Sequence, residues 1–220
     1  MDYDPDMPFF RQEGDNVEKV QSSKEIRAIL EKYGITGMTD GGLTEEGEHE
    51  ADTVMRTEFL LMEAGFNNGL EWAPPANGVY AFDVEMFDEE NMYRDFLMSI
   101  SALGGEKLKF ENIVDDTSGV DWENEEGNRL VSFDWDGQHY TIETMAANDW
   151  FDPQVAVALS EIVKEKDTGK RLYFHMDCCG QIVFVFYRDA DWAEGFQRDT
   201  GLFLSDDPMD GGPDLDDSLF

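Results

Sequence analysis

The chain has 220 residues, and its 50 Asp and Glu against 16 Lys and Arg give a formal net charge of −34. This charge excludes direct binding to nucleic acid or to an anionic membrane, because both would repel the protein. A hydrophobic content of 41%, with 16 Phe, 7 Tyr and 5 Trp, excludes a disordered chain over most of its length, since these side chains suffice to build a core.

The front third of the chain, residues 21–66, predicts two helices. Ser22 is followed three residues later by a glutamate, which is the spacing of a capping box, and Gly34 comes after the apolar repeat. Thr44 is the expected N-cap of the second helix, whose apolar stripe runs to Gly65.

Residues 79–204 change to a mixture of strand and helix patterns. The predicted order of elements is β-α-β-β-β-α-β-β-α, which indicates an α+β fold with a mostly antiparallel sheet of five to six strands and packed helices. The run 182–187 is apolar without alternation, so we expect a central strand covered on both faces. The expected helices carry Phe96, Leu159 and Phe196.

A hairpin turning at Asp136 and Gly137 is the sharpest local prediction, because this dipeptide suits the positive backbone angles of a type I′ turn. A two-residue turn here places Asp134 opposite His139, so we interpret these side chains as a cross-strand pair and not as an acid–base set. The other expected pairs are Phe133 with Tyr140, Val131 with Ile142, and Ser132 with Thr141.

Composition divides the chain into five parts. We expect a flexible N-terminus at 1–20, a helical segment at 21–66, a connector rich in turn formers at 67–78, an α+β domain at 79–204 and an acidic tail at 205–220. The connector is therefore the expected boundary between the helical segment and the α+β domain.

The acidic loop expected over residues 115–126 is the candidate surface for binding a partner. Carboxylates steer a basic partner into place, and a few aromatic side chains supply most of the affinity of a protein interface. Trp122 lies within this loop, and Trp72 in the connector is a second expected anchor. The candidate partner-binding residues are Asp115, Asp116, Asp121, Trp122, Glu123, Glu125 and Glu126.

A metal site is the main alternative. Glu45, His49 and Asp52 would share one helical face and could hold a hard metal ion, which would suit a metal-dependent hydrolase. We favour a solvated acidic helix turn, because HExxH and related spacings are absent, and the acidic runs do not fit a calcium-binding loop. No cofactor, metal ligand or catalytic residue is therefore assigned.

The two cysteines, Cys178 and Cys179, are adjacent and have His175 nearby in sequence. We interpret them as an inert turn, because the neighbouring Asp177 raises the pKa of a thiol and opposes activation. The scarcity of cysteine and the acidic start of the chain, which lacks the features of a signal peptide, predict a cytoplasmic protein.

These observations favour a non-enzymatic protein that binds a basic protein partner, with no direct contact with nucleic acid or membrane. In size, charge and fold class the chain resembles bacterial immunity proteins that inhibit toxins, including basic nucleases. The resemblance is one of physical type, carried by no family motif, and it implies an inhibitor. Mimicry of nucleic acid, with carboxylates in place of phosphates, and adaptation to high salt are further alternatives.

Overall fold

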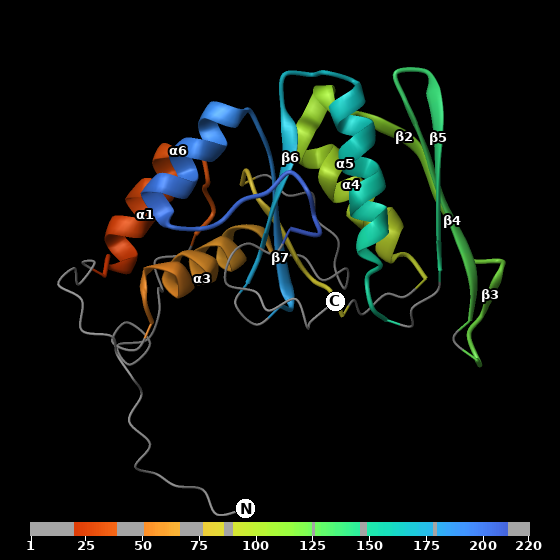
Figure 1. The fold of residues 1–220 in the computed structure, drawn as a ribbon, viewed down its shortest axis with the longest axis horizontal. Coiled ribbons are helices and arrows are strands. Elements are labelled where there is room, and N and C mark those ends of the chain that lie inside the picture. Colours follow the sequence, from red (N-terminus) through yellow and green to blue (C-terminus); the bar gives the residue numbers. More distant parts are fainter. Residues whose placement is uncertain are drawn as a thin grey trace, which may run out of the picture.

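A computed structural model describes residues 20–38, 51–66, 77–85, 90–124, 126–145, 149–177 and 180–210. These residues form five α-helices and two antiparallel sheets, which confirms the α+β class (Figure 1). The helices are α1 (Ser23–Lys32), α3 (Thr53–Gly65), α4 (Met92–Gly104), α5 (Pro153–Glu165) and α6 (Ala190–Thr200), with a short 3-10 turn, η1 (Gly105–Lys107). The strands are β1 (Tyr80–Asp83), β2 (Phe110–Asp116), β3 (Val120–Asp121), β4 (Glu126–Trp135), β5 (Gln138–Met145), β6 (Arg171–Met176) and β7 (Ile182–Arg188).

The elements form four layers. The first sheet has the order β1-β7-β6, and in the second sheet β4 pairs with β2, β3 and β5. Helices α1, α3 and α6 cover one face of the first sheet, and α4 and α5 lie between the two sheets (Figure 1). The sequence pattern predicted the helices and strands but assigned the strands to one sheet, and the structure divides them between two.

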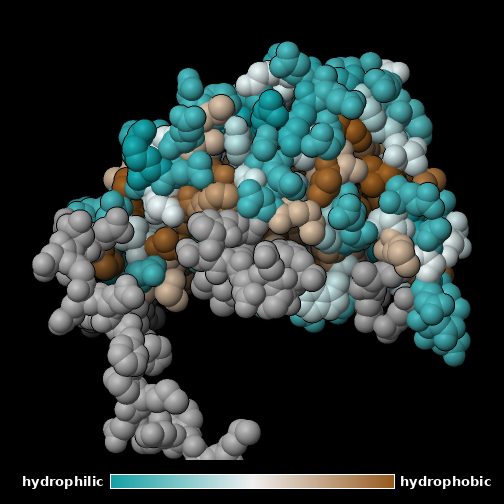
Figure 2. Space-filling view, in the orientation of Figure 1, coloured by the Kyte–Doolittle hydropathy of each residue, from teal (hydrophilic) through white to brown (hydrophobic). Residues whose placement is uncertain are grey.

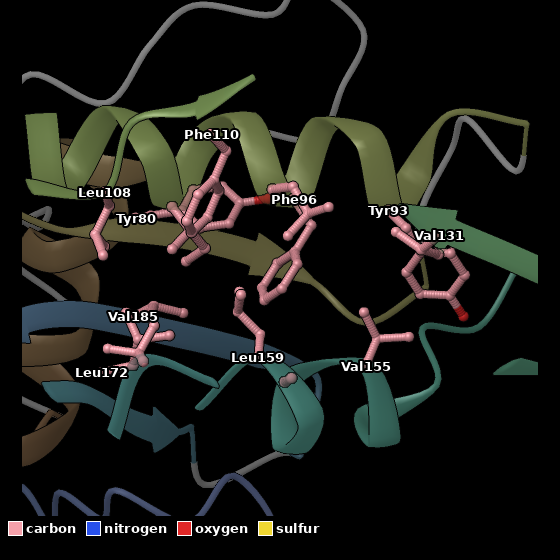
Figure 3. Close-up of a cluster of buried hydrophobic side chains, with 14 of the residues drawn as sticks. Tyr80, Tyr93, Phe96, Leu108, Phe110, Val131, Val155, Leu159, Leu172 and Val185 are labelled. Carbon is pink, nitrogen blue, oxygen red and sulfur yellow. The ribbon is translucent and has the colours of Figure 1, made fainter. Parts of the chain in front are cut away.

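Strand β7 is central, as its unbroken apolar run predicted. The first six of its seven residues are buried, and the strand pairs with β1 on one side and β6 on the other. Phe184 and Phe186 enter one core with α1, α3 and α6, while Val183 and Val185 enter a second core. Side chains from both sheets, α4 and α5 converge in this second core (Figure 3).

Local capping signals place several of the helix ends correctly. The capping box at Ser22 and the end of α3 at Gly65 are confirmed. Helix α3, however, begins at Thr53, because the Asp52 carboxylate accepts a hydrogen bond from the Met55 backbone N–H (2.9 Å) and caps the helix there. The prediction of one helix from Thr44 is therefore wrong, and Thr44 itself lies outside the described residues.

The hairpin at Asp136 and Gly137 is confirmed in turn geometry and in register. Both residues have positive φ, 51° and 74°, and Asp134 pairs with His139 across the strands. The remaining pairs are Phe133 with Tyr140, Val131 with Ile142 and Ser132 with Thr141. Among the described residues no helix has the length and apolar character required to cross a membrane.

Candidate functional site

One face of the second sheet is covered by no described element. Helices α4 and α5 lie against one side of β2, β4 and β5, and no described element lies against the other (Figure 1). Along β4, buried side chains alternate with side chains that point away from the helices, as expected for a sheet with one solvated face. The outward side chains, called here the open face, are Val114, Asp116, Asn128, Leu130, Ser132, Asp134, His139, Thr141, Glu143 and Met145.

Leu130 lies at the centre of the open face with a carboxylate on each side. The strand register places Asp116 on β2 and Glu143 on β5 directly opposite Leu130. Side chains paired in this way have Cβ atoms about 5 Å apart. Val114 and Met145 are the diagonal neighbours of Leu130, and the three apolar side chains are 49%, 67% and 42% exposed, respectively. The open face therefore carries an exposed apolar line between acidic side chains.

The charge of this sheet is almost entirely negative. Residues 110–145 contain ten carboxylates and a single Lys or Arg, Arg129. Arg129 is buried, so its charge does not reach the open face. Lys109, immediately before β2, pairs with Glu111 (Nζ–Oε1 3.1 Å). The acidic side chains are Glu111, Asp115, Asp116, Asp121, Glu123, Glu125, Glu126, Asp134, Asp136 and Glu143.

Asp115 and Arg129 form an ion pair on the inner side of the second sheet. The guanidinium donates to both carboxylate oxygens (Nε–Oδ1 3.2 Å, Nη2–Oδ2 2.6 Å), and each side chain is 1% exposed. Arg129 also lies over the rings of Tyr93 (4.6 Å) and Trp122 (5.9 Å), and the Tyr93 backbone N–H donates to Asp115. Burial raises the pKa of the Asp115 carboxyl, and the hydrogen bonds from Arg129 oppose this rise. Asp115 is therefore a structural residue, and its side chain is not available to a partner.

The segment expected as an acidic loop is in fact built from strands and tight turns. Asp115 and Asp116 end β2, and residues 120–121 form β3, which pairs with the start of β4. We call residues 116–124, 126 and 127 the acidic tip; it projects at the lower right of Figure 1, where the surface in Figure 2 is hydrophilic. Glu125 lies outside the described residues.

Two carboxylates of the acidic tip, Asp116 and Asp121, accept hydrogen bonds from the backbone N–H groups of nearby residues in tight turns. Asp116 accepts from the Ser118 N–H (2.9 Å), and Asp121 accepts from the N–H groups of Glu123 (3.1 Å) and Asn124 (3.2 Å). Hydrogen bonds from Ser118 lower the pKa of Asp116, and those from Asn124 and Glu123 lower the pKa of Asp121. Both carboxylates are therefore charged at neutral and mildly acidic pH. The Trp122 side chain is 37% exposed, and its ring lies 5.9 Å from the Arg129 guanidinium.

Gly127 is required where β3 meets β4. Its φ is +123°, and a Cβ atom added there would lie 2.2 Å from the backbone oxygen of Gly119. We predict that Gly127→Ala lowers the free energy of unfolding by about 2–3 kcal/mol. The added Cβ strains the positive φ of residue 127 and forces the backbone near Gly119 to move away. Gly137→Ala is the matched control: its φ of +74° is also positive, but no atom lies within 4 Å of the added Cβ. Urea unfolding checks the prediction, which equal losses in the two variants would contradict.

The other candidate residues give no catalytic arrangement in the described part of the chain. His139 Nδ1 contacts Asp134 Oδ1 (2.7 Å) on the open face, and Asn112 donates to the other Asp134 oxygen (2.7 Å). The hydrogen bond from Asn112 lowers the pKa of Asp134 the most, and the contact with His139 lowers it further. The described residues also contain no group of three His, Cys, Asp or Glu that could hold a metal ion. The candidates that lie outside the described residues are Glu45, His49, Trp72, Cys178 and Cys179.

Sequence reasoning missed two features. His175 is buried, and its ring contacts the Phe203 carbonyl oxygen (Nδ1–O 2.9 Å) and Glu58 (Nε2–Oε1 3.0 Å), which no spacing along the chain indicates. The register predicted that the hairpin is buried on one side only, but the exposed side was not identified as a candidate binding surface. Extending that register by one alternate pair brings Leu130 opposite Glu143, on the same side as the polar pairs.

A hollow of about 530 Å³ lies between α4 and β2. Two cations, Arg94 and Lys109, line it, and each is paired with an acid of its own chain. The hollow contains no His or Cys, and its one hydroxyl that could act as a nucleophile, that of Ser101, accepts a hydrogen bond from the Phe110 backbone N–H (3.2 Å), with no His in the lining to activate it. Its other lining residues are Met98, Ser101, Ala102, Gly105, Glu106, Phe110, Asn112 and Ile113.

Comparison of the chain with protein-family models, with curated proteins and with solved structures gave no match.

Proposed function

We propose that this protein is a non-enzymatic binding protein that holds a basic protein partner on the open face and the acidic tip. The observation that carries the proposal is the row of Asp116, Leu130 and Glu143, an exposed apolar side chain between two carboxylates. Interfaces combine a desolvated apolar centre with a charged rim in this way. Of the candidate residues predicted from the sequence, Asp116, Asp121, Trp122, Glu123 and Glu126 belong to the proposed surface, and Asp115 supports it from inside.

Charge and apolar contact have separate roles in this proposal. The unbalanced carboxylates steer a basic partner during its approach and disfavour acidic competitors. Leu130, Val114 and Met145 are exposed and supply the apolar contact on the open face, and Trp122, whose ring lies by Arg129, supplies an aromatic side chain at the acidic tip. An inhibitor of a basic toxin or nuclease would use the same surface, and this is the finer form of the proposal.

A paired-variant binding experiment tests the proposal. The double variant Asp116→Asn with Glu143→Gln removes two charges from the open face. The control, Asp191→Asn with Glu194→Gln, removes two exposed charges from α6, at the far end of the four layers (Figure 1). Immobilised wild-type protein is used to capture partners from native lysate at low salt, and each captured basic protein is then purified and titrated against all three proteins.

We expect the open-face variant to weaken binding of the purified partner by about tenfold or more, and the α6 control to stay near wild type. An equal loss of binding in both variants would show that only the net charge matters and would contradict the proposed surface. Duplex DNA serves as a competitor in the same titration. If duplex DNA displaces the captured protein, the partner is a nucleic-acid-binding protein, and this protein acts as a mimic of nucleic acid.

A further inference from the structure

The outer strands of the two sheets differ in how their edges are covered. In the first sheet, β6 is bridged at Phe174 by Ser205, with backbone hydrogen bonds of 2.8 and 3.1 Å in the two directions. The other outer strand, β1, is bridged at Ala81 by Phe66, and Glu85 just beyond it is bridged by Trp150. No such bridge is made to β5 in the second sheet by any described residue.

The register shows which backbone groups of β5 are available. In a hairpin closed by a two-residue turn, the pair next to the turn is hydrogen-bonded and the pairs then alternate. Trp135 and Gln138 are the pair next to the turn, so Asp134 and His139 form a non-hydrogen-bonded pair. The N–H and C=O groups of β5 that point away from β4 are accordingly those of His139, Thr141, Glu143 and Met145.

Strand β5 has few of the features by which proteins usually block an exposed edge, and its one acidic side chain is Glu143. Its eight residues contain no proline and no lysine, and they pair with β4 without a bulge. The opposite outer strand, β2, has such a feature: its register shifts between Glu111 and Val114, and Asn112 has a φ of +51°. Of the two outer strands β2 and β5, as far as the described residues show, β5 thus has the edge better suited to accept another strand.

We propose that the basic partner adds an extended segment to the edge of β5, an inference that rests on the proposed function and names its binding mode. Side chains of the added strand that point to the open face would lie beside Glu143, on the same face as Asp116. This position favours lysine or arginine. A second copy of this chain is a poor occupant, because two molecules of net charge −34 would have to bring their acidic faces together.

The probe is a short peptide of alternating lysine and valine, with a control peptide of the same sequence whose backbone is N-methylated on the edge-facing residues. Thr141→Pro removes an outward N–H without removing a hydrogen bond to β4, and Thr141→Val keeps that N–H. We expect Thr141→Pro and N-methylation each to weaken binding by about tenfold, while Thr141→Val binds like wild type. Circular dichroism and urea unfolding of Thr141→Pro confirm that the variant is folded.

The outcomes separate the binding mode from the function. If the open-face variant Asp116→Asn with Glu143→Gln loses the peptide but Thr141→Pro and the N-methylated peptide bind normally, strand addition is overturned and the acidic surface stands. If the wild-type protein binds neither peptide at low salt, and no basic protein is captured either, the proposed function falls together with this inference. If the wild-type chain forms dimers and Thr141→Pro abolishes them, a second copy of this chain occupies the edge, and the basic-partner proposal is overturned.

Discussion

Replacing Arg129 by methionine is expected to lower the free energy of unfolding by about 3–5 kcal/mol, because it leaves the Asp115 carboxylate buried without its cation. Both side chains are 1% exposed, so water cannot take the place of the guanidinium. The lost contacts with Tyr93 and Trp122 add to the effect, since Arg129 lies over both rings. Urea unfolding at neutral pH measures the loss.

The double variant Arg129→Met with Asp115→Asn separates the two contributions. Asparagine keeps an acceptor for the Tyr93 N–H but carries no charge, so we expect it to restore most of the lost stability. Lys109→Met is the matched surface control. Lys109 is also paired with an acid, but its side chain is 63% exposed, so we expect its replacement to leave the stability nearly unchanged. A similar loss in Arg129→Met and Lys109→Met would contradict the structural role of the buried pair.

Replacing Glu58 by leucine is expected to cost about 3 kcal/mol, because His175 then loses the partner of its Nε2 atom in the core. The Nδ1 atom faces the Phe203 carbonyl oxygen, which only accepts, so Nδ1 donates to it, while Nε2 lies 3.0 Å from Glu58 Oε1. The contact joins α3, β6 and the segment after α6. Loss of Glu58 therefore weakens the attachment of the N-terminal helices to the first sheet.

Glu58→Gln provides the conservative variant, because its amide can donate to Nε2 of a neutral imidazole, and we expect it to retain most of the stability. Glu161→Leu on α5 is the surface control; its side chain is 62% exposed and pairs with Lys164 at 2.9 Å. Unfolding is followed in urea by circular dichroism and by tryptophan fluorescence. Wild-type stability in Glu58→Leu would show that the buried contact contributes nothing.

Part of the candidate surface could be predicted because the hairpin register is a local property. The positive φ angles at Asp136 and Gly137 and the alternation along β4 and β5 follow from residues that are close in sequence. Together they place Leu130 and Glu143 side by side. The partner across β2 could not be predicted in this way, because Asp116 reaches Leu130 only through pairing that includes a bulge.

The sequence alone determined the local structure of this protein: the capping box at Ser22, the turn at Asp136, the burial of β7 and the excess of carboxylates. These depend on backbone angles, on the spacing of apolar residues and on composition, all of which are read from neighbouring positions. Only the tertiary structure decided that the strands form two sheets, that Asp115 is buried against Arg129, and that no described element covers one face of the second sheet. Pairing between distant strands, and the burial of a charge that it permits, depend on the free energy of the whole fold. The net charge of −34 follows from composition alone, whereas the packing of α4 and α5 against one side of the second sheet, with no described element against the other side, follows from the tertiary structure.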